Sequence, residues 1–359
     1  MTIFKVAVAK GDGIGPEVVD AALQVLKALE KKDVFSFSLQ EIPIGGYAID
    51  LCGEPLPAEA LDICQGSDAV LLGAVGGSKW EDKKYAKKPE SALLALRKSL
   101  GLYANLRPVK LFNELEEASP LKEEIIARGI DLCIVRELTG GIYFGPRGLR
   151  NNNQQEEEAY DTELYSRKEI ERIGKVAFDL ARKRRAIVTS VDKANVLESS
   201  RLWRKVMEEL AAGYPDVTLN HMYVDNAAMQ LIRDPAQFDV IVTSNLFGDI
   251  LSDQGGTLIG SLGMLPSASM GLNRRGMFEP VHGSAPDIAG KEIANPLGTI
   301  LSAAMMLRLS LGLEHEAQKI EHAVQRALKN GYRTADIMND GMQLVGTKAM
   351  SEAVIRELN

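Results

Sequence analysis

The chain has 359 residues, of which 45% are hydrophobic and 25% are charged, a composition typical of a soluble globular protein long enough for two domains. Its formal net charge of −7 argues against a surface built to bind nucleic acid. The three cysteines, Cys52, Cys64 and Cys133, form no C-x-x-C pair, which favours a reducing cytoplasm and argues against a zinc site.

Short apolar segments alternate with longer amphipathic ones along the chain. Residues 3–9 read as a first strand rather than a secretory signal, and further strands are expected at 69–73, 130–136, 185–191 and 239–243. Helices are expected at 90–100, 167–184, 198–213, 297–312 and 315–330. The apolar stretch 297–313 is too short for the roughly 20 residues of a membrane span, so we expect a buried helix there and no membrane segment. The alternation predicts an α/β fold.

Three glycines follow the first strand. Gly11, Gly13 and Gly15 resemble a dinucleotide-binding fingerprint, but the third glycine comes one residue early, directly before Pro16. A Rossmann interpretation would need an acidic residue about 20 positions further on, for which Glu41 is the available candidate. We expect instead that the glycines form a tight turn near the active cleft.

Three arginines stand near the ends of predicted elements. Arg97 lies on the helix at 90–100, Arg107 precedes a proline, and Arg136 ends a strand. Guanidinium groups match carboxylates with two parallel hydrogen bonds, so these residues are candidates for binding an acidic substrate; the alternative is ordinary ion pairs. Tyr143, in a glycine-rich turn, is a candidate proton donor or a packed aromatic ring.

Two further charged residues follow strands in the middle of the chain. Lys193 is a candidate general base if its surroundings lower its pKa from the usual value of about 10.4; the alternative is a surface lysine. Asp225 lies between a short strand and a helix. Residues 150–161 are polar without helical periodicity and are expected to form a loop or a projecting arm.

Asp249 and Asp253 open a helix after the strand at 239–243. Their spacing of four residues puts both carboxylates on one helical face, where they repel each other unless a cation lies between them. Oxygen ligands suit a hard divalent ion such as Mg²⁺ or Mn²⁺. The alternative is an acidic first turn that the helix dipole stabilises.

Taken together, six segments resemble the motifs of the isocitrate/isopropylmalate dehydrogenases, the β-decarboxylating dehydrogenases of 2-hydroxy acids. They are Gly11-Asp-Gly-Ile-Gly-Pro-Glu17, Tyr103-Ala-Asn-Leu-Arg-Pro108, Arg136-Glu-Leu-Thr-Gly-Gly-Ile-Tyr143, Asp192-Lys-Ala-Asn195, Asp225-Asn-Ala and Asp249 with Asp253. The resemblance runs essentially the whole length of the chain. It implies an α/β fold of two domains with a large mixed sheet, which is not a Rossmann fold.

The resemblance also implies how the domains and subunits are organised. Residues 1–104 and 257–359 would form a first domain with both termini and the NAD site. Residues 105–256 would form a second domain with the metal site, the dimer interface and the arm near 150–161. The expected assembly is a homodimer with shared active sites, in the cytoplasm.

By the same resemblance, Arg97, Arg107 and Arg136 would bind the substrate carboxylates. Asp249 and Asp253 of one subunit, with the partner subunit's Asp225, would hold Mg²⁺ or Mn²⁺ and contact the substrate through it. The partner subunit's Lys193 would accept the hydroxyl proton as hydride passes to nicotinamide. After loss of CO₂, Tyr143 would protonate C3.

The resemblance further places the cofactor on His282, Gly283, Ser284, Ala285, Asp287, Ile288 and Asn295. His282 and Asn295 would contact adenine. Asp287 would bind the adenosine ribose hydroxyls and repel a 2′-phosphate, which selects NAD over NADP. The alternative for Asp287 is a helix cap.

The helix at 90–100 suggests the small-molecule substrate. Leu93 lies four residues before Arg97 on the same face and suits a C3 isopropyl group, as in 3-isopropylmalate; the alternative is plain core. Glu90 would repel the third carboxylate of isocitrate and contact the nicotinamide ribose. Malate, tartrate and isocitrate are the alternative substrates. A catalytically silent member of the family is disfavoured because every matched polar position is present.

Overall fold

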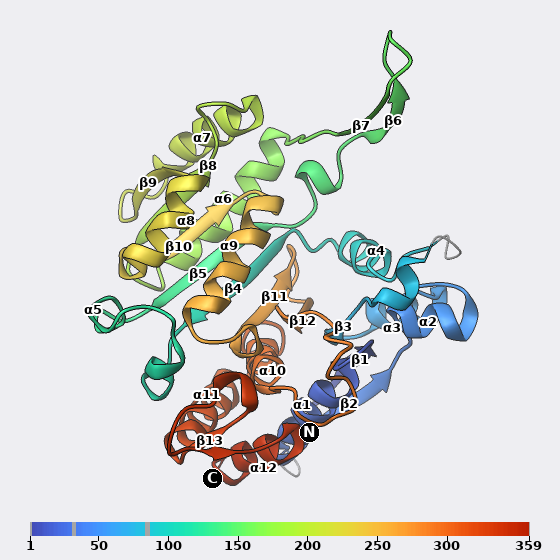
Figure 1. The fold of residues 1–359 in the computed structure, drawn as a ribbon, viewed down its shortest axis with the longest axis vertical. Helices are drawn as coiled ribbons and strands as arrows, with labels where there is room; N and C mark the ends of the chain where they lie inside the picture. Colours follow the sequence, from blue (N-terminus) through green and yellow to red (C-terminus); the bar gives the residue numbers. More distant parts are fainter. Residues whose placement is uncertain (1, 31–33, 83–86, 359) are drawn as a thin grey trace. The chain divides into compact units, whose positions relative to one another are not determined.

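The computed structural model describes residues 2–30, 34–82 and 87–358, which divide into two compact units (Figure 1). Unit 1 consists of Met1–Leu102, Leu111–Pro120 and Gly256–Asn359, and unit 2 consists of Tyr103–Lys110 and Leu121–Gly255. Unit 1 therefore contains the segments nearest both ends of the chain.

Unit 1 contains five adjacent strands of a mixed sheet, in the order β2-β1-β3-β12-β11. The strands are β1 (Thr2–Gly11), β2 (Phe35–Glu41), β3 (Ala69–Ala74), β11 (Pro266–Met270) and β12 (Gly276–Pro280). β1 runs parallel to both β2 and β3, whereas β11 and β12 are antiparallel. The antiparallel pair distinguishes this arrangement from the parallel sheet of a Rossmann fold.

The helices of unit 1 follow its strands. They are α1 (Gly15–Leu29), α2 (Gly45–Cys52), α3 (Ala58–Gly66), α4 (Ser91–Ser99), α10 (Leu297–Leu309), α11 (Glu314–Lys329) and α12 (Thr347–Arg356), with two short strands, β13 (Tyr332–Arg333) and β14 (Gln343–Leu344). α10 is buried from Leu297 to Leu307 among its neighbouring helices and strands. No helix in the described part of the chain is long and apolar enough to cross a membrane.

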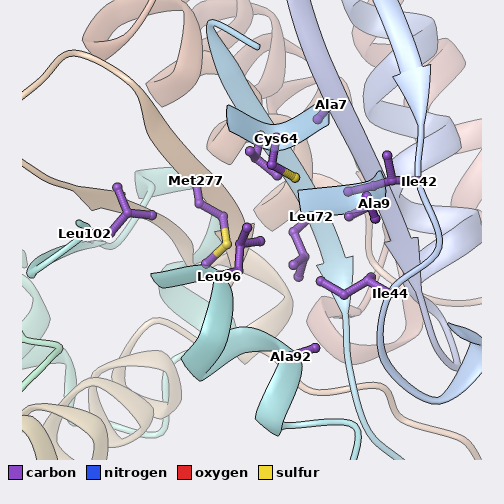
Figure 2. Packing of buried hydrophobic residues seen from close by; sticks show 12 residues of the cluster. Ala7, Ala9, Ile42, Ile44, Cys64, Leu72, Ala92, Leu96, Leu102 and Met277 are labelled. Atoms are coloured by element: carbon purple, nitrogen blue, oxygen red, sulfur yellow. The ribbon is translucent and has the colours of Figure 1, made fainter. Parts of the chain in front are cut away.

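The core beside α4 fixes the orientation of the helix face that carries Leu93 and Arg97. Ala92 and Leu96 are fully buried and pack with Leu72 of β3 and Met277 of β12 (Figure 2). The next residues of the same turns, Leu93 and Arg97, are thereby held in defined positions. α4 begins one residue later than the predicted 90–100, because Glu90 is its N-cap.

Unit 2 contains a second set of five adjacent strands, in the order β4-β5-β10-β8-β9. They are β4 (Ala104–Lys110), β5 (Asp131–Glu137), β8 (Ile187–Asp192), β9 (Thr218–Tyr223) and β10 (Val240–Thr243). β4 and β5 are antiparallel, and the remaining pairs are parallel. The helices are α5 (Glu123–Ile126), α6 (Arg167–Ala181), α7 (Glu198–Ala211), α8 (Val224–Arg233) and α9 (Asn245–Leu258).

Local sequence explains two further features of unit 2. α6 begins at a capping box, in which the Glu169 side chain accepts a hydrogen bond from the Ser166 backbone and the Ser166 hydroxyl accepts one from the Glu169 backbone. The segment predicted as a loop or arm forms an antiparallel hairpin, β6 (Arg147–Asn151) with β7 (Glu157–Asp161), which projects from the unit (Figure 1). The expected α/β fold in two units with mixed strands is confirmed.

Candidate active site

The arginines of unit 2 meet an aspartate of α9. Arg107 on β4 and Arg136 on β5 lie on one face of an antiparallel pair, in which Asn105 is opposite Arg136. The Asp249 carboxylate accepts hydrogen bonds from Arg136 Nη1 at 2.5 Å and Arg107 Nη1 at 3.3 Å. The structure therefore brings three of the predicted site residues into direct contact.

Both guanidinium groups are buried and are oriented by neutral acceptors. Arg107 donates from Nε to Asn105 at 2.6 Å and from Nη1 to the Ser252 hydroxyl at 2.5 Å. Arg136 donates from Nε and Nη2 to the Asn245 amide oxygen at 3.1 and 2.8 Å. These three partners are uncharged; the negative charge that faces the two guanidinium groups comes from Asp249 and, 3.6 Å from Arg107 Nη1, from Asp253.

A glycine of α9 makes room for Arg136. A Cβ atom on Gly248 would lie 2.6 Å from Cγ of Arg136, closer than two carbon atoms approach in proteins. The helix backbone thus passes directly over the arginine side chain. Any larger residue here would displace the guanidinium group from Asp249.

The two acidic residues of α9 have an environment that fits a cation. Asp249 and Asp253 offer oxygen donors on one face, and their side chains are 35% and 59% exposed. Burial raises the pKa of Asp253, Arg107 opposes this shift, and the negative charge of Asp249 adds to it. A divalent ion would relieve that repulsion. Within the described residues of one chain, no group of three His, Cys, Asp or Glu side chains could hold a metal, so these two carboxylates form an incomplete set.

Tyr143 lies beside the same aspartate. Its hydroxyl donates to Asp249 Oδ2 at 3.3 Å, and the Arg136 guanidinium lies 5.9 Å from its ring centroid. Burial raises the pKa of Tyr143, and the charge of Asp249 raises it further against the opposing effect of Arg136. The hydroxyl therefore keeps its proton at neutral pH, as a proton donor must.

Lys193 and Asp225 pair with each other at the ends of neighbouring parallel strands. Lys193 follows β8 and Asp225 follows β9, and Lys193 Nζ donates to Asp225 Oδ1 at 2.5 Å. The hydrogen bond from Lys193 lowers the pKa of Asp225. Among the described contacts of unit 2, this pair makes none with Asp249 or Asp253.

Unit 1 carries the remaining predicted substrate residues. Arg97 is buried and donates to Glu279 of β12 at 2.9 Å, a partner that sequence reasoning did not assign. Leu93 is partly buried, and Glu90 is exposed beside the Gly76 turn. A leucine with this exposure is available to a ligand as well as to the core.

The predicted cofactor loop packs on the glycine turn after β1. The Ser284 carbonyl accepts from the Ile14 backbone at 2.8 Å, and a Cβ on Gly13 would lie only 1.9 Å from that carbonyl oxygen. Gly13 also has a φ of +59°, so glycine is required there twice over. The tight turn expected from the sequence is confirmed.

The seven predicted cofactor residues differ in exposure. Gly283 and Asp287 are exposed, Ala285 and Ile288 are partly buried, and Ser284 is buried. His282 bonds through Nδ1 to the Gly283 carbonyl, and burial lowers its pKa, which keeps the ring neutral. An exposed carboxylate at Asp287 fits hydroxyl groups of a ribose.

Asn295 is buried and already oriented by unit 1. Its Nδ2 donates to Asp336 at 3.0 Å, while its Oδ1 accepts from the Leu297 backbone at the start of α10. Sequence reasoning did not find Asp336, because it lies 41 residues further along the chain. It also missed Asp12, whose buried carboxylate accepts from the backbone of Gly46, Tyr47 and Gly76.

Comparisons with known proteins find similar sequences over nearly the whole chain. Residues 5–354 match the family described as isocitrate/isopropylmalate dehydrogenase. The chain is 58% identical to 3-isopropylmalate dehydrogenase of Clostridium acetobutylicum over 358 residues, covering all of both chains. It is 59% identical to 3-isopropylmalate dehydrogenase of Geobacillus kaustophilus over 351 residues, covering 98% of this chain and 94% of that one.

Two solved structures have a fold similar to that of this chain. The crystal structure of isocitrate dehydrogenase from Methylococcus capsulatus superimposes with a TM-score of 0.88 at 36% identity, covering 99% of each chain. A β-decarboxylating dehydrogenase from Thermococcus kodakarensis, in its apo form, gives a TM-score of 0.79 at 38% identity, covering 99% and 96%.

Proposed function

The chain belongs to the isocitrate/isopropylmalate dehydrogenase family, and on that premise we propose that it oxidises 3-isopropylmalate and removes CO₂ to give 4-methyl-2-oxopentanoate in leucine biosynthesis. The family consists of oxidoreductases that use a dinucleotide and a divalent metal. The contact of Arg107, Arg136 and Tyr143 with Asp249 is the single structural observation that carries the proposal. It joins two anion-binding groups, a proton donor and a metal-binding carboxylate.

Substrate binding would exchange one set of ion pairs for another. Arg107 and Arg136 now pair with Asp249, and a substrate carboxylate would take over some of these hydrogen bonds. Arg97 would serve the second carboxylate with part of its guanidinium, while Glu279 holds the rest. Because the arginine side chains are already buried and hydrogen-bonded, little ordering entropy should oppose binding.

Asp249 and Asp253 would hold Mg²⁺ or Mn²⁺ together with the partner subunit's Asp225. When bound, the ion would supply positive charge beside the C2 oxygen, where negative charge develops. Bound NAD supplies the acceptor for the hydride of C2. The partner subunit's Lys193 takes the hydroxyl proton, and Tyr143 delivers a proton to C3 after the bond from C3 to the departing carboxyl group breaks.

We infer NAD rather than NADP from the loop after β12. Asp287 is exposed there and would accept hydrogen bonds from the ribose diol. A 2′-phosphate in its place would meet a negative charge. His282, Gly283, Ser284, Ala285, Ile288 and Asn295 complete the proposed site.

Sharing of the site between two subunits is supported by the surface near Asp225. Met229 and Ile232 of α8 and Ile250 of α9 are 54%, 49% and 57% exposed, although all three are large and apolar. Large apolar side chains that are exposed on one chain are often covered at a subunit interface. The Leu149 side chain on the hairpin is 70% exposed, which fits an arm that reaches a partner. We place the homodimer in the cytoplasm, where the three free cysteines stay reduced.

The test is a substrate panel for the purified chain with NAD and Mn²⁺. Leu93 favours an isopropyl group by about 2 kcal/mol of apolar burial, whereas the third carboxylate of isocitrate would meet Glu90. We expect kcat/KM to fall from 3-isopropylmalate to malate to isocitrate. Preference for malate or tartrate would assign a sister activity, and turnover of none of them would indicate a silent member of the family.

A further inference from the structure

Glu137 is a fully buried carboxylate that has no part in the proposed reaction. It ends β5 directly after the substrate-binding Arg136, and its side chain is 0% exposed. Burying a charged group costs free energy unless several donors compensate it. The identity and position of those donors therefore indicate what the carboxylate holds in place.

The donors come from the turn that follows β5 and from α6. The carboxylate accepts from the backbone of Thr139 at 3.0 Å and of Gly140 at 2.7 Å, and from the Thr139 hydroxyl at 3.2 Å. Arg172 of α6 donates from Nη2 to Glu137 at 2.9 Å and to Thr139 Oγ1 at 2.6 Å. Burial raises the pKa of Glu137, and these donors oppose that rise.

The same turn carries Tyr143. Residues Gly141–Tyr143 form a single 3-10 turn directly after the bonds to Glu137. Gly141 has a φ of +74°, and a Cβ on it would lie 2.4 Å from the hydroxyl of Tyr165, so the turn follows a path that only glycine permits. The position of the Tyr143 hydroxyl near Asp249 thus depends on how firmly this turn is held.

Asn245 joins the turn to the substrate-binding arginine. Its amide nitrogen donates to the Gly140 carbonyl at 3.2 Å, while its oxygen accepts from Arg136. Its backbone donates to the Tyr165 hydroxyl at 2.8 Å. The Arg136 guanidinium is therefore held directly by Asn245 and Asp249, and is linked to Glu137 only through Asn245 and Gly140.

We propose that Glu137, braced by Arg172, is a positioning residue that fixes the turn at 138–143 so that Tyr143 delivers its proton to one face of C3. This inference rests on the proposed function, in which Tyr143 is the proton donor. Glutamine cannot replace the carboxylate, because its NH₂ group would face donors of the turn or of Arg172. Because Asn245 and Asp249 hold the Arg136 guanidinium directly, we expect substrate binding to depend on Glu137 less than the position of Tyr143 does.

The first measurement compares wild type with Glu137→Gln. A positioned acid contributes roughly 10²–10⁴ in rate, and a loosened turn keeps part of it, so we expect kcat to fall about 10- to 100-fold. KM for 3-isopropylmalate should change less than about threefold, because an interaction outside ground-state binding is lost. A rise in KM as large as the fall in kcat would overturn the proposal.

The second measurement follows the proton itself. In D₂O, C3 of the product gains one deuteron, and immediate chemical reduction of the keto acid preserves its configuration for NMR. Wild type should place deuterium on a single face, and Glu137→Gln on both. A slowed variant that remains fully stereospecific would show that Glu137 does not act through Tyr143.

A double-mutant cycle and a matched control complete the design. Glu137→Gln added to Tyr143→Phe should slow the enzyme less than about twofold further, whereas independent effects would multiply and refute the idea. Asp239→Asn removes another fully buried carboxylate of unit 2, bonded to Arg184 at 2.8 Å, at the opposite end of β10 from Asn245. It should lower stability and leave deuteration on one face.

Two provisions keep the experiment decisive. If Glu137→Gln does not fold, Arg172→Gln tests the same brace from the more exposed side and should give the same loss of stereospecificity; retention of one-faced deuteration would contradict the proposal. Failure of wild type to convert 3-isopropylmalate would refute the proposed function, whereas normal wild-type turnover with a stereospecific variant refutes only the role of Glu137.

Discussion

At the scale of single residues, the site depends on close approaches as much as on charges. Gly248→Ala would place a methyl group 2.6 Å from Cγ of Arg136. The guanidinium would have to leave Asp249 and Asn245, and we expect KM for 3-isopropylmalate to rise about 10-fold, the equivalent of 1.4 kcal/mol. Gly213→Ala, in a turn of unit 2 where the nearest neighbour atom is 3.4 Å away, is the control. Unchanged KM in Gly248→Ala would show that Arg136 does not bind the substrate.

The stability of the fold should depend on pH through the carboxyl group of Glu163. Burial raises the pKa of Glu163, which lies beside Tyr165, Ser244 and Phe247 at a small cavity. The folded state thus keeps this proton to higher pH than the unfolded state. The contribution of Glu163 to stability is present below the unfolded pKa and is lost as pH rises through the folded pKa.

Glu163→Gln should therefore stabilise the fold by about 0.5 kcal/mol at pH 7 and have no effect near pH 4. Urea unfolding at both pH values measures the difference. A variant that is destabilised at pH 7 would show that the ionised carboxylate has a favourable partner.

At the scale of elements, the five helices and the five strands expected from the sequence all form, but elements without a clear apolar pattern were not predicted. The 3.6-residue apolar period is clear in α6, α7 and α11, each of which buries one face, whereas α10 is buried on all sides. β11 and β12 were not predicted, since each has five residues and neither PSASM nor GMFEP shows strand-type alternation. Their pairing is set by partners far along the chain.

The candidate site was likewise predicted only in part from the sequence. The arginines, Tyr143 and Asp249 were found because each residue type carries chemistry at the end of an element. Glu137 and Asn245 lie within or beside recognised motifs, but their importance comes from hydrogen bonds to residues up to 109 positions away. No local pattern contains that information.

α6 provides a prediction at this scale. Ser166→Ala removes the hydroxyl that caps the helix and should cost about 1 kcal/mol of unfolding free energy. Arg172 lies more than a turn inside the helix, so kcat should stay within about twofold of wild type. Urea unfolding and steady-state kinetics on one preparation measure both, and a large fall in kcat at unchanged stability would contradict this account.

At the scale of the whole molecule, the proposed sharing of active sites can be tested by mixing two inactive enzymes. Lys193→Met and Asp249→Asn would each abolish activity. In a mixed dimer one site carries both defects and the other carries neither, so activity should recover to about a quarter of wild type after random subunit exchange. Mass spectrometry verifies the exchange, and verified hybrids without activity would show that each site is built from one chain.

The order of the unit 1 strands along the chain affects when they can pair during synthesis. β3 ends at Ala74, but β12, its neighbour in the sheet, begins at Gly276. The ribosome must therefore add 276 − 74 = 202 residues before that edge of β3 meets its partner. At 5–20 residues per second this takes about 10–40 s. Unit 2, whose strands are all synthesised in that interval, can fold first, while the open apolar edge of β3 is the part of the nascent chain most in need of a chaperone.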